Sequence, residues 1–260
     1  MGELVFIGLG LYDEKDLSLR ALEEARRCDV LFAEFYTSSL RGTTAETLAA
    51  LIGTPVAVLH REDVESGVVL LRQASSKRVG FLVPGDPMMA TTHLDLRLRA
   101  AEAGIPTRIV HGSSIFTAAI GLLGLQAYKF GATTTIPIPE KGFRPTSPVD
   151  VIAANRAAGR HTLVLLDLKE DGRFLSANEA LRYLIEIGGA KFPPSILVCA
   201  VGGAGSPSPV ARADRAERLL AAGLGPPLHC LIVPGTLHFA EREALLRFAA
   251  APVDALPPPS

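Results

Sequence analysis

Residues 79–93 have the sequence Val79-Gly80-Phe81-Leu82-Val83-Pro84-Gly85-Asp86-Pro87-Met88-Met89-Ala90-Thr91-Thr92-His93. The apolar run at the start of this segment predicts a buried β-strand over Val79 to Val83. Two prolines then hold a rigid bend, and Gly85 allows the backbone to approach a ligand closely. Asp86 is thereby presented at the carboxyl end of a strand, where ligands bind in α/β proteins. The segment predicts an α/β fold with a ligand site at this bend.

The chemistry of the bend suits a small polar ligand. The carboxylate of Asp86 can accept hydrogen bonds from a ribose or an amino group, while Met88 and Met89 supply soft apolar surface. The alternative is an ordinary Asp-Pro turn in which the methionines fill gaps in the core.

Outward from this segment, short runs of Val, Ile and Leu alternate with segments of helical spacing, which is typical of an α/β protein with largely parallel sheets. Strands are predicted at Leu4 to Gly8, Val30 to Ala33, Val56 to Leu59, Val79 to Val83, Thr107 to Val110, Thr133 to Pro137, Thr162 to Asp167, Ile196 to Val201 and His229 to Val233. Helices are expected over Ser113 to Leu125 and from Val149, Ala177, Val210 and Leu237. The helix over Ser113 to Leu125 is interpreted as the passage into a second half of the chain. We therefore expect an N-terminal domain over 1–112, a C-terminal domain over 113–252 and a loose proline-rich tail over 253–260.

The first helix is expected after Asp16, whose carboxylate can cap the free amide groups of the first turn. Its inward stripe is predicted to consist of Leu17, Ala21, Ala25 and Cys28. Its outward face is predicted to keep four charged side chains in water, those of Arg20, Glu23, Glu24 and Arg27.

Composition limits the classes of partner. The 260 residues carry 26 Lys and Arg against 27 Asp and Glu, so no broad cationic surface is expected for nucleic acid or an anionic membrane. The cysteines Cys28, Cys199 and Cys230 lie far apart and predict buried thiols in a reducing compartment. We see no secretion signal and no apolar run long enough to cross a bilayer, and therefore expect a cytoplasmic protein.

A glycine-rich turn, Gly8-Leu9-Gly10-Leu11-Tyr12-Asp13, follows the first predicted strand. Glu34 lies at roughly the distance, about 20 residues on, of the ribose-binding acid of a dinucleotide fold. However, Asp13 replaces the third glycine, and its carboxylate would repel a pyrophosphate at that place. The acidic-Gly-x-Gly-x-Gly run of the common methyltransferase fold is also missing. A turn of purely structural importance remains the alternative.

Two hydroxyl side chains, Ser113 and Ser114, follow the fifth predicted strand and open the next helix. They can cap this helix or contact a ligand at its N-terminus.

Several of these runs together resemble the diphthine synthase family within the tetrapyrrole methylase superfamily. The matching runs are Phe6-Ile-Gly-Leu-Gly-Leu-Tyr-Asp-Glu, Ala33-Glu-Phe-Tyr-Thr-Ser, Pro84-Gly-Asp-Pro-Met-Met-Ala-Thr-Thr-His, Tyr128-Lys-Phe-Gly, His161-Thr-Leu-Val-Leu-Leu-Asp-Leu-Lys, Ala204-Gly-Ser and Ile232-Val-Pro-Gly-Thr-Leu-His. They span nearly the whole chain. The sequence departs from the superfamily at Leu11 and Tyr12, where tetrapyrrole-modifying relatives carry a Gly-Pro-Gly turn, and at Gly203, where a basic residue is expected.

The resemblance implies two αβα domains with mostly parallel or mixed sheets, S-adenosyl-L-methionine in the cleft between them, no metal, and a homodimer. It also implies successive methyl transfers that trimethylate the amine of an aminocarboxypropyl-modified histidine on translation elongation factor 2 to give diphthine, a step of diphthamide biosynthesis. The implied cofactor contacts are Leu11, Asp86, Met89, Ser114, Ile115, Leu166, Ala204 and His229.

Methyl transfer to an amine also needs a proton acceptor, and the candidates by predicted location are Glu34, His111 and Asp86. The segments Tyr36 to Gly42 and Lys129 to Arg144 either frame an opening for the protein substrate or are solvated loops. Two other functions stay open at this point. One is methylation of a corrinoid or porphyrin precursor, and the other is a nucleotide-binding module without enzymatic activity.

Overall fold

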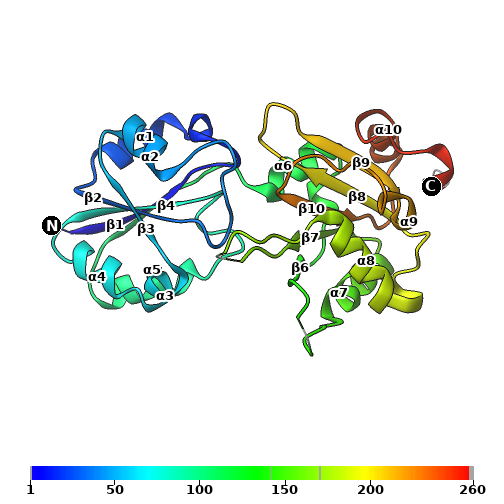
Figure 1. Cartoon of the computed structure of the whole chain (residues 1–260), viewed down its shortest axis with the longest axis horizontal. Helices are drawn as coiled ribbons and strands as arrows, with labels where there is room; N and C mark the ends of the chain where they lie inside the picture. Colours follow the sequence, from blue (N-terminus) through cyan, green and yellow to red (C-terminus); the bar gives the residue numbers. More distant parts are fainter. Residues whose placement is uncertain (1, 141, 170, 258–260) are drawn as a thin grey trace. The chain divides into compact units, whose positions relative to one another are not determined.

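The computed structural model describes residues 2–140, 142–169 and 171–257. Its contacts divide the chain into two compact units, Met1–Ile115 and Phe116–Ser260, each built around a five-stranded sheet (Figure 1). The predicted α/β class with parallel and mixed sheets is confirmed. The domain boundary expected at 112/113 stays a prediction.

The first unit contains a fully parallel sheet with the strand order β3-β2-β4-β1-β5. Its strands are β1 (Glu3–Gly8), β2 (Val30–Glu34), β3 (Val56–Leu59), β4 (Arg78–Val83) and β5 (Thr107–Val110). Its helices are α1 (Leu19–Arg26), α2 (Ala45–Ile52), α3 (Arg61–Ser66), α4 (Val68–Ala74) and α5 (His93–Glu102), with a 3-10 turn η1 (Glu14–Asp16). Because β4, β1 and β5 are neighbours, the loops at their carboxyl ends share one edge of the sheet.

Helices cover both faces of this sheet, α1 and α2 on one side and α3, α4 and α5 on the other (Figure 1). Side chains alternate between the faces, so Val5 and Ile7 of β1 pack with α1 and α2, while Leu4 and Phe6 pack with the opposite helices. Burial on both faces explains why the central strands β1, β2 and β4 are nearly continuous apolar runs in the sequence.

The second unit has a mixed sheet in the order β6-β7-β10-β8-β9. Its strands are β6 (Thr134–Ile136), β7 (Thr162–Leu166), β8 (Leu197–Gly202), β9 (Val210–Arg215) and β10 (His229–Val233). The helical segments are α6 (Ile115–Leu123), η2 (Ala127–Lys129), α7 (Ser147–Ala157), α8 (Ala177–Gly188), η3 (Gly189–Lys191), α9 (Ala216–Leu219), α10 (Phe239–Phe248) and η4 (Val253–Ala255). β6 runs parallel to β7, whereas β10 is antiparallel to both β7 and β8.

The helix predicted from Val210 is wrong. Residues Val210–Arg215 form β9, which pairs antiparallel with β8 from Gly202↔Val210 to Leu197↔Arg215. The alanines at 211 and 213 favour a helix, but pairing with a buried neighbouring strand overrides this local preference. A helix, α9, begins only at Ala216.

The tail also differs from expectation over 253–257, while 258–260 lie outside the described residues. Val253–Ala255 form η4, and Leu256 is buried. Arginines anchor this segment: Arg215 and Arg242 donate to the carbonyl oxygens of Asp254 and Pro257. The prolines prevent a long helix but not this packing.

The first helix confirms its predicted inward stripe, since Ala21, Ala25 and Cys28 are buried and Leu17 packs beside them. Two other expectations for this helix are wrong. Ser18, rather than Asp16, caps it by accepting from the amide of Ala21. Glu24 is buried, not solvated, and forms an ion pair with Arg78 of β4.

The described residues contain no helix with the length and apolar character needed to cross a bilayer. The thiols of Cys28, Cys199 and Cys230 are all buried and free, as predicted.

Candidate functional site

Gly8 and Gly112 let the backbone segments at the carboxyl edge of the first sheet lie in direct contact. A Cβ atom on Gly112 would lie 2.3 Å from the carbonyl oxygen of Gly85, and one on Gly8 would lie 2.5 Å from the amide nitrogen of Gly112. Gly10 and Gly85 also exchange backbone hydrogen bonds, of 2.6 Å and 3.3 Å. Any side chain at Gly8 or Gly112 would push these backbone segments apart, so both positions require glycine.

Asp86 lies in the middle of this edge with 9% of its surface exposed. Its Oδ1 accepts from the amide of Met88 at 3.0 Å, which fixes the carboxylate within its own turn. Its Oδ2 lies 2.7 Å from Nδ1 of His111, which follows β5. The carboxylate is therefore held by two loops, and the imidazole beside it is the more exposed partner, at 74%.

His93, at the start of α5, supports the bend from behind. Its Nδ1 lies 3.0 Å from the carbonyl oxygen of Pro87, and its ring packs edge-on against Phe81 with centroids 5.0 Å apart. Burial lowers the pKa of His93, so the ring is neutral and Nδ1 donates to the carbonyl. The sequence marked His93 only as the end of a motif. A buried histidine one turn after a Pro-Gly-Asp-Pro bend is the signal that could have found this role.

The turn that carries Leu11 is shaped by Asp16. One carboxylate oxygen of Asp16 accepts from the amides of Leu11 at 2.9 Å and Tyr12 at 2.7 Å. Asp16 thus organises the preceding turn instead of capping the following helix. Gly10 adopts a φ of +83°, and a Cβ there would lie 2.3 Å from the Cβ of Asp16. Asp13 accepts from the amide of Lys15 and caps η1.

The structure brings together the five predicted cofactor residues of the first unit. Leu11 follows β1, Asp86 and Met89 follow β4, and Ser114 and Ile115 follow β5, so all five lie at one edge of the sheet. Asp86 and Ser114 are largely buried, whereas the Met89 side chain is 42% exposed. This loop also holds Ala90 at a positive φ of 54°, a strained conformation of the kind that is concentrated at functional sites.

The three predicted cofactor residues of the second unit also share one edge of their sheet. Leu166 ends β7, His229 begins β10 opposite Gly202 of β8, and Ala204 follows β8. His229 is partly buried, and its Nε2 lies 3.2 Å from the carbonyl oxygen of Gly225. Desolvation lowers the pKa of His229, which favours the neutral ring. The cofactor role of all eight residues stays a prediction.

Glu34 closes β2, as predicted, but its carboxyl group is fully buried. One oxygen accepts from the amides of Tyr36 at 2.9 Å and Thr37 at 3.0 Å, and the other binds the Thr37 hydroxyl. Burial raises the pKa of Glu34 despite these bonds. Its observed contacts organise the bend over 35–37, which begins one of the two segments expected to face a protein substrate.

A buried cluster in the second unit joins three of the motif runs. Glu241 of α10 accepts from His161 Nε2 at 3.0 Å and from the amides of Gln126 and His238, both at 2.8 Å, and it forms an ion pair with Lys129. His161 Nδ1 in turn accepts from the amide of Gly235 at 3.0 Å. The runs beginning at Tyr128, His161 and Ile232 therefore meet here, although no role was predicted for their polar residues.

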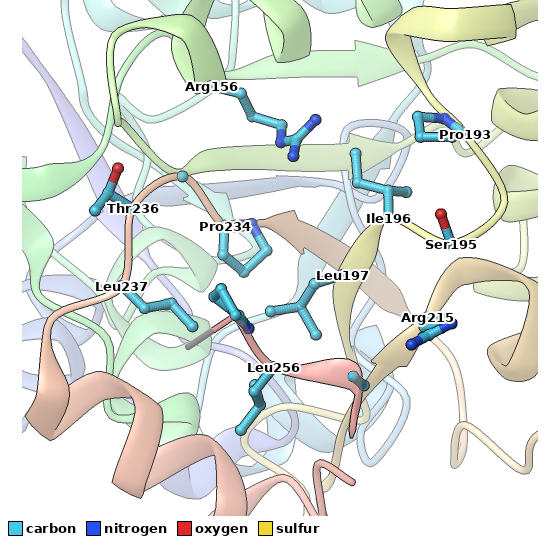
Figure 2. Close-up of a pocket in the computed structure, with 13 residues that line it drawn as sticks. Arg156, Pro193, Ser195, Ile196, Leu197, Arg215, Pro234, Thr236, Leu237 and Leu256 are labelled. Carbon is cyan, nitrogen blue, oxygen red and sulfur yellow. The ribbon is translucent and has the colours of Figure 1, made fainter. Parts of the chain in front are cut away.

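This cluster holds the loop after β10, which borders a cavity of about 610 Å³ (Figure 2). The cavity lies where β8 begins and β9 and β10 end, opposite the edge that carries Leu166 and His229. Its lining residues are Arg156, Pro193, Ser195, Ile196, Leu197, Arg215, Pro234, Gly235, Thr236, Leu237, Ala255, Leu256 and Pro257. None of the predicted cofactor residues contributes to it.

No group of three or more His, Cys, Asp or Glu side chains suited to a metal ion occurs within 2–140, 142–169 and 171–257.

Comparison with known proteins supplies a family. The sequence model of the tetrapyrrole (corrin/porphyrin) methylases matches residues 3–206. The diphthine synthase of Methanosarcina mazei is 47% identical over 257 residues, covering 96% of this chain and 97% of that protein. The diphthine synthase of Methanoregula boonei is 49% identical over 247 residues, covering 95% and 98%.

Solved structures give the same result. A crystal structure of diphthine synthase superposes with a TM-score of 0.90 at 41% identity, covering 97% of this chain and 98% of that one. The putative diphthine synthase from Entamoeba histolytica superposes with a TM-score of 0.85 at 32% identity, covering 97% and 100%.

Proposed function

Because this chain belongs to the tetrapyrrole (corrin/porphyrin) methylase family, we propose that it is an S-adenosylmethionine-dependent methyltransferase that acts as a diphthine synthase. The observation that carries the proposal is the 47% identity to a diphthine synthase over 97% of that protein's length. Agreement over nearly the whole chain supports a shared activity more strongly than a shared motif does.

The reaction that we propose is methylation of the amine of an aminocarboxypropyl group on a histidine of elongation factor 2. The amine nitrogen forms a bond to the methyl carbon while the bond from that carbon to sulfur breaks, and sulfur keeps the electron pair. Since the sulfonium already activates the methyl group, the main task of the protein is to hold the three reacting atoms in line. Positioning of this kind contributes roughly 7–11 kcal/mol to catalysis.

The residues at the carboxyl edge of the first sheet fit the cofactor. The glycine contacts allow close approach of backbone, the Asp86 carboxylate can accept hydrogen bonds from ribose hydroxyls or an amino group, and Met89 offers exposed apolar surface. We propose that Leu11, Asp86, Met89, Ser114 and Ile115 hold it from this unit. Leu166, Ala204 and His229 are the proposed contacts from the second unit.

Four further features of the protein belong to the same proposal. They are a homodimer, domains over 1–112 and 113–252, a cytoplasmic location alongside the translation machinery, and a protein rather than nucleic-acid or membrane partner. The net charge of −1 supports local recognition of a protein partner over binding to a polyanion.

Transfer of a radioactive methyl group tests the function. The protein is incubated with methyl-labelled S-adenosylmethionine and elongation factor 2 that carries the aminocarboxypropyl group. Label is expected on this factor and not on a factor whose histidine is unmodified. Label on a corrinoid or porphyrin precursor, with none on the modified factor, would contradict the proposal. Cofactor binding without any transfer would instead support a nucleotide-binding module.

A further inference from the structure

We propose that His111 is the general base of the methyl transfer and that Asp86 orients its ring. This inference rests on the proposed function, because it concerns the proton that the substrate amine must lose. An alkylammonium ion has no lone pair at nitrogen, so each transfer requires a proton acceptor close to the amine.

The hydrogen bond between the two side chains determines which nitrogen of His111 is available. Asp86 Oδ2 lies 2.7 Å from Nδ1 of His111, and a carboxylate can only accept a hydrogen bond. The proton of the neutral imidazole therefore resides on Nδ1, which leaves the lone pair on Nε2. Met88 holds the other oxygen of Asp86, so the carboxylate cannot rotate freely away from the ring.

Exposure separates His111 from the other candidates on this edge. Its side chain is 74% exposed, so Nε2 can reach a substrate amine. Glu34 is fully buried, and both of its oxygens bind the segment over 36–37. His93 is also buried, and its Nδ1 binds the carbonyl of Pro87. His111 thus combines an oriented ring with an accessible nitrogen.

The place of His111 in the fold supports this role. It directly follows β5, next to Gly112, which contacts Gly8 at the end of β1 and Gly85 in the loop after β4. Since β5 and β4 flank β1, the histidine and the proposed cofactor residues Leu11, Asp86 and Met89 lie on the same edge. A base at this place lies on the same sheet edge as the residues proposed to bind the cofactor.

The proton and electron pairs balance without a further reactant. The ammonium nitrogen gives a proton to Nε2 of His111 and keeps the electron pair. This pair forms the bond to the methyl carbon, and the pair of the breaking bond stays on sulfur. Asp86 stabilises the resulting imidazolium, which releases its proton to water before the next transfer.

The test uses His111→Asn in the full-length protein. The amide nitrogen of Asn can still donate to Asp86, but the side chain cannot accept a proton near neutral pH. Single-turnover transfer to the modified elongation factor is expected to slow about 10²- to 10⁴-fold at pH 7. The rate of the variant should rise with pH as free amine forms in solution, whereas the rate of the parent protein should rise much less over the same pH range. Calorimetry should find cofactor affinity changed by less than about threefold, since removing one base alters chemistry more than binding.

Several outcomes distinguish the possibilities. A His111→Asn rate and pH profile like those of the parent overturn the role of His111 and leave the proposed function intact. A parent protein that transfers no label overturns the proposed function and this inference with it. If His111→Asn does not fold, His111→Gln replaces it with the same criteria. A folded variant can also lose cofactor binding and show no recovery of rate at high pH. This result assigns His111 to cofactor binding and overturns its role as the general base.

Discussion

Two histidine–carboxylate pairs in this molecule have similar short contacts and opposite surroundings. His111 and Asp86 lie 2.7 Å apart at an open edge of the first sheet, with the His111 side chain 74% exposed. His161 and Glu241 lie 3.0 Å apart in the second unit, and neither side chain is exposed. On the proposal that His111 is the base, the surroundings of such a pair, more than its distance, decide whether it can do chemistry.

The buried pair has no capacity to exchange a proton without losing structure. Both nitrogens of His161 are engaged, Nδ1 as acceptor from Gly235 and Nε2 as donor to Glu241. Burial lowers the pKa of His161 even though Glu241 opposes this effect. The two oxygens of Glu241 also bind Lys129 and two backbone amides. The pair therefore acts as a clamp between η2, β7, the loop after β10 and α10.

The largest expected effect is on stability, from Glu241→Gln. The amide cannot replace a carboxylate that receives four donors, and the change leaves the ammonium group of Lys129 without its charged partner. Breaking a buried ion pair in this way costs about 3–5 kcal/mol of unfolding free energy. Urea denaturation monitored by circular dichroism measures this loss.

Glu243→Gln is the matched control on the same helix. Glu243 pairs with Arg247 in an exposed i,i+4 position, so its loss should cost less than about 0.5 kcal/mol. Equal destabilisation by the two substitutions would show that the buried cluster is not a clamp.

The second prediction concerns the exposed pair. Asp86→Ala removes a carboxylate proposed to bind the cofactor, and a hydrogen bond to a charged group contributes about 1.5–3 kcal/mol, or roughly 10- to 100-fold in affinity. Calorimetric titration with S-adenosylmethionine measures this change. The fold should persist, because Asp86 lies in a loop at the sheet edge and its side chain contacts another loop. Unchanged affinity would remove Asp86 from the proposed site.

The comparison also shows what could be predicted from sequence. The central strands β1, β2 and β4 are nearly continuous apolar runs because both of their faces are buried, and all five strands of the first sheet were located. Asp86 was found because prolines and glycine mark its bend. Its contact with His111 depends on β4 and β5 flanking β1, which is a tertiary arrangement that local patterns do not contain.

Two of the wrong predictions have the same cause. β9 is rich in alanine and becomes a strand only through its pairing with β8. Glu24 looks solvent-facing by helical spacing, but its partner Arg78 is 54 residues away. His161, Lys129 and Glu241 meet from three separated segments, so none of them showed a role alone. Long-range pairing of charges leaves no periodic signal in a sequence.

The third prediction is a pH dependence from the buried histidine. The pKa of His161 is lowered in the folded protein from an ordinary value of 6.5, so the unfolded chain binds more protons just below that pH. Stability should consequently fall as pH decreases from 6.5, by up to about 1.4 kcal/mol per pH unit for this one group. Denaturation at several pH values between 5 and 7.5 measures the slope.

His161→Gln isolates this contribution. The pKa values of His93 and His229 are also lowered by burial, but both residues remain in the variant, so their contributions cancel in the difference. The variant should be less stable at pH 7 and show a shallower slope. An unchanged slope would mean that His161 is not held in its neutral form by the fold.

The smallest effect is expected from Glu34→Gln, which asks whether burial alone can exclude a candidate base. Burial raises the pKa of Glu34 from 4.5, so the folded protein binds more protons than the unfolded chain as pH rises above that value. The unfolding free energy of the parent protein therefore falls over this pH range. Glutamine keeps an acceptor for the amides of Tyr36 and Thr37. The stability of the variant relative to the parent should improve as pH rises, with a net change at pH 7 of less than about 1 kcal/mol.

The rate of methyl transfer by Glu34→Gln should stay within about threefold of the parent rate, because the Glu34 carboxyl organises a bend and is closed to the substrate. A loss of a hundredfold or more in the single-turnover rate of a stable Glu34→Gln protein would transfer the role of base from the exposed His111 to this buried carboxyl. Exposure would then no longer separate a reactive group from a structural one.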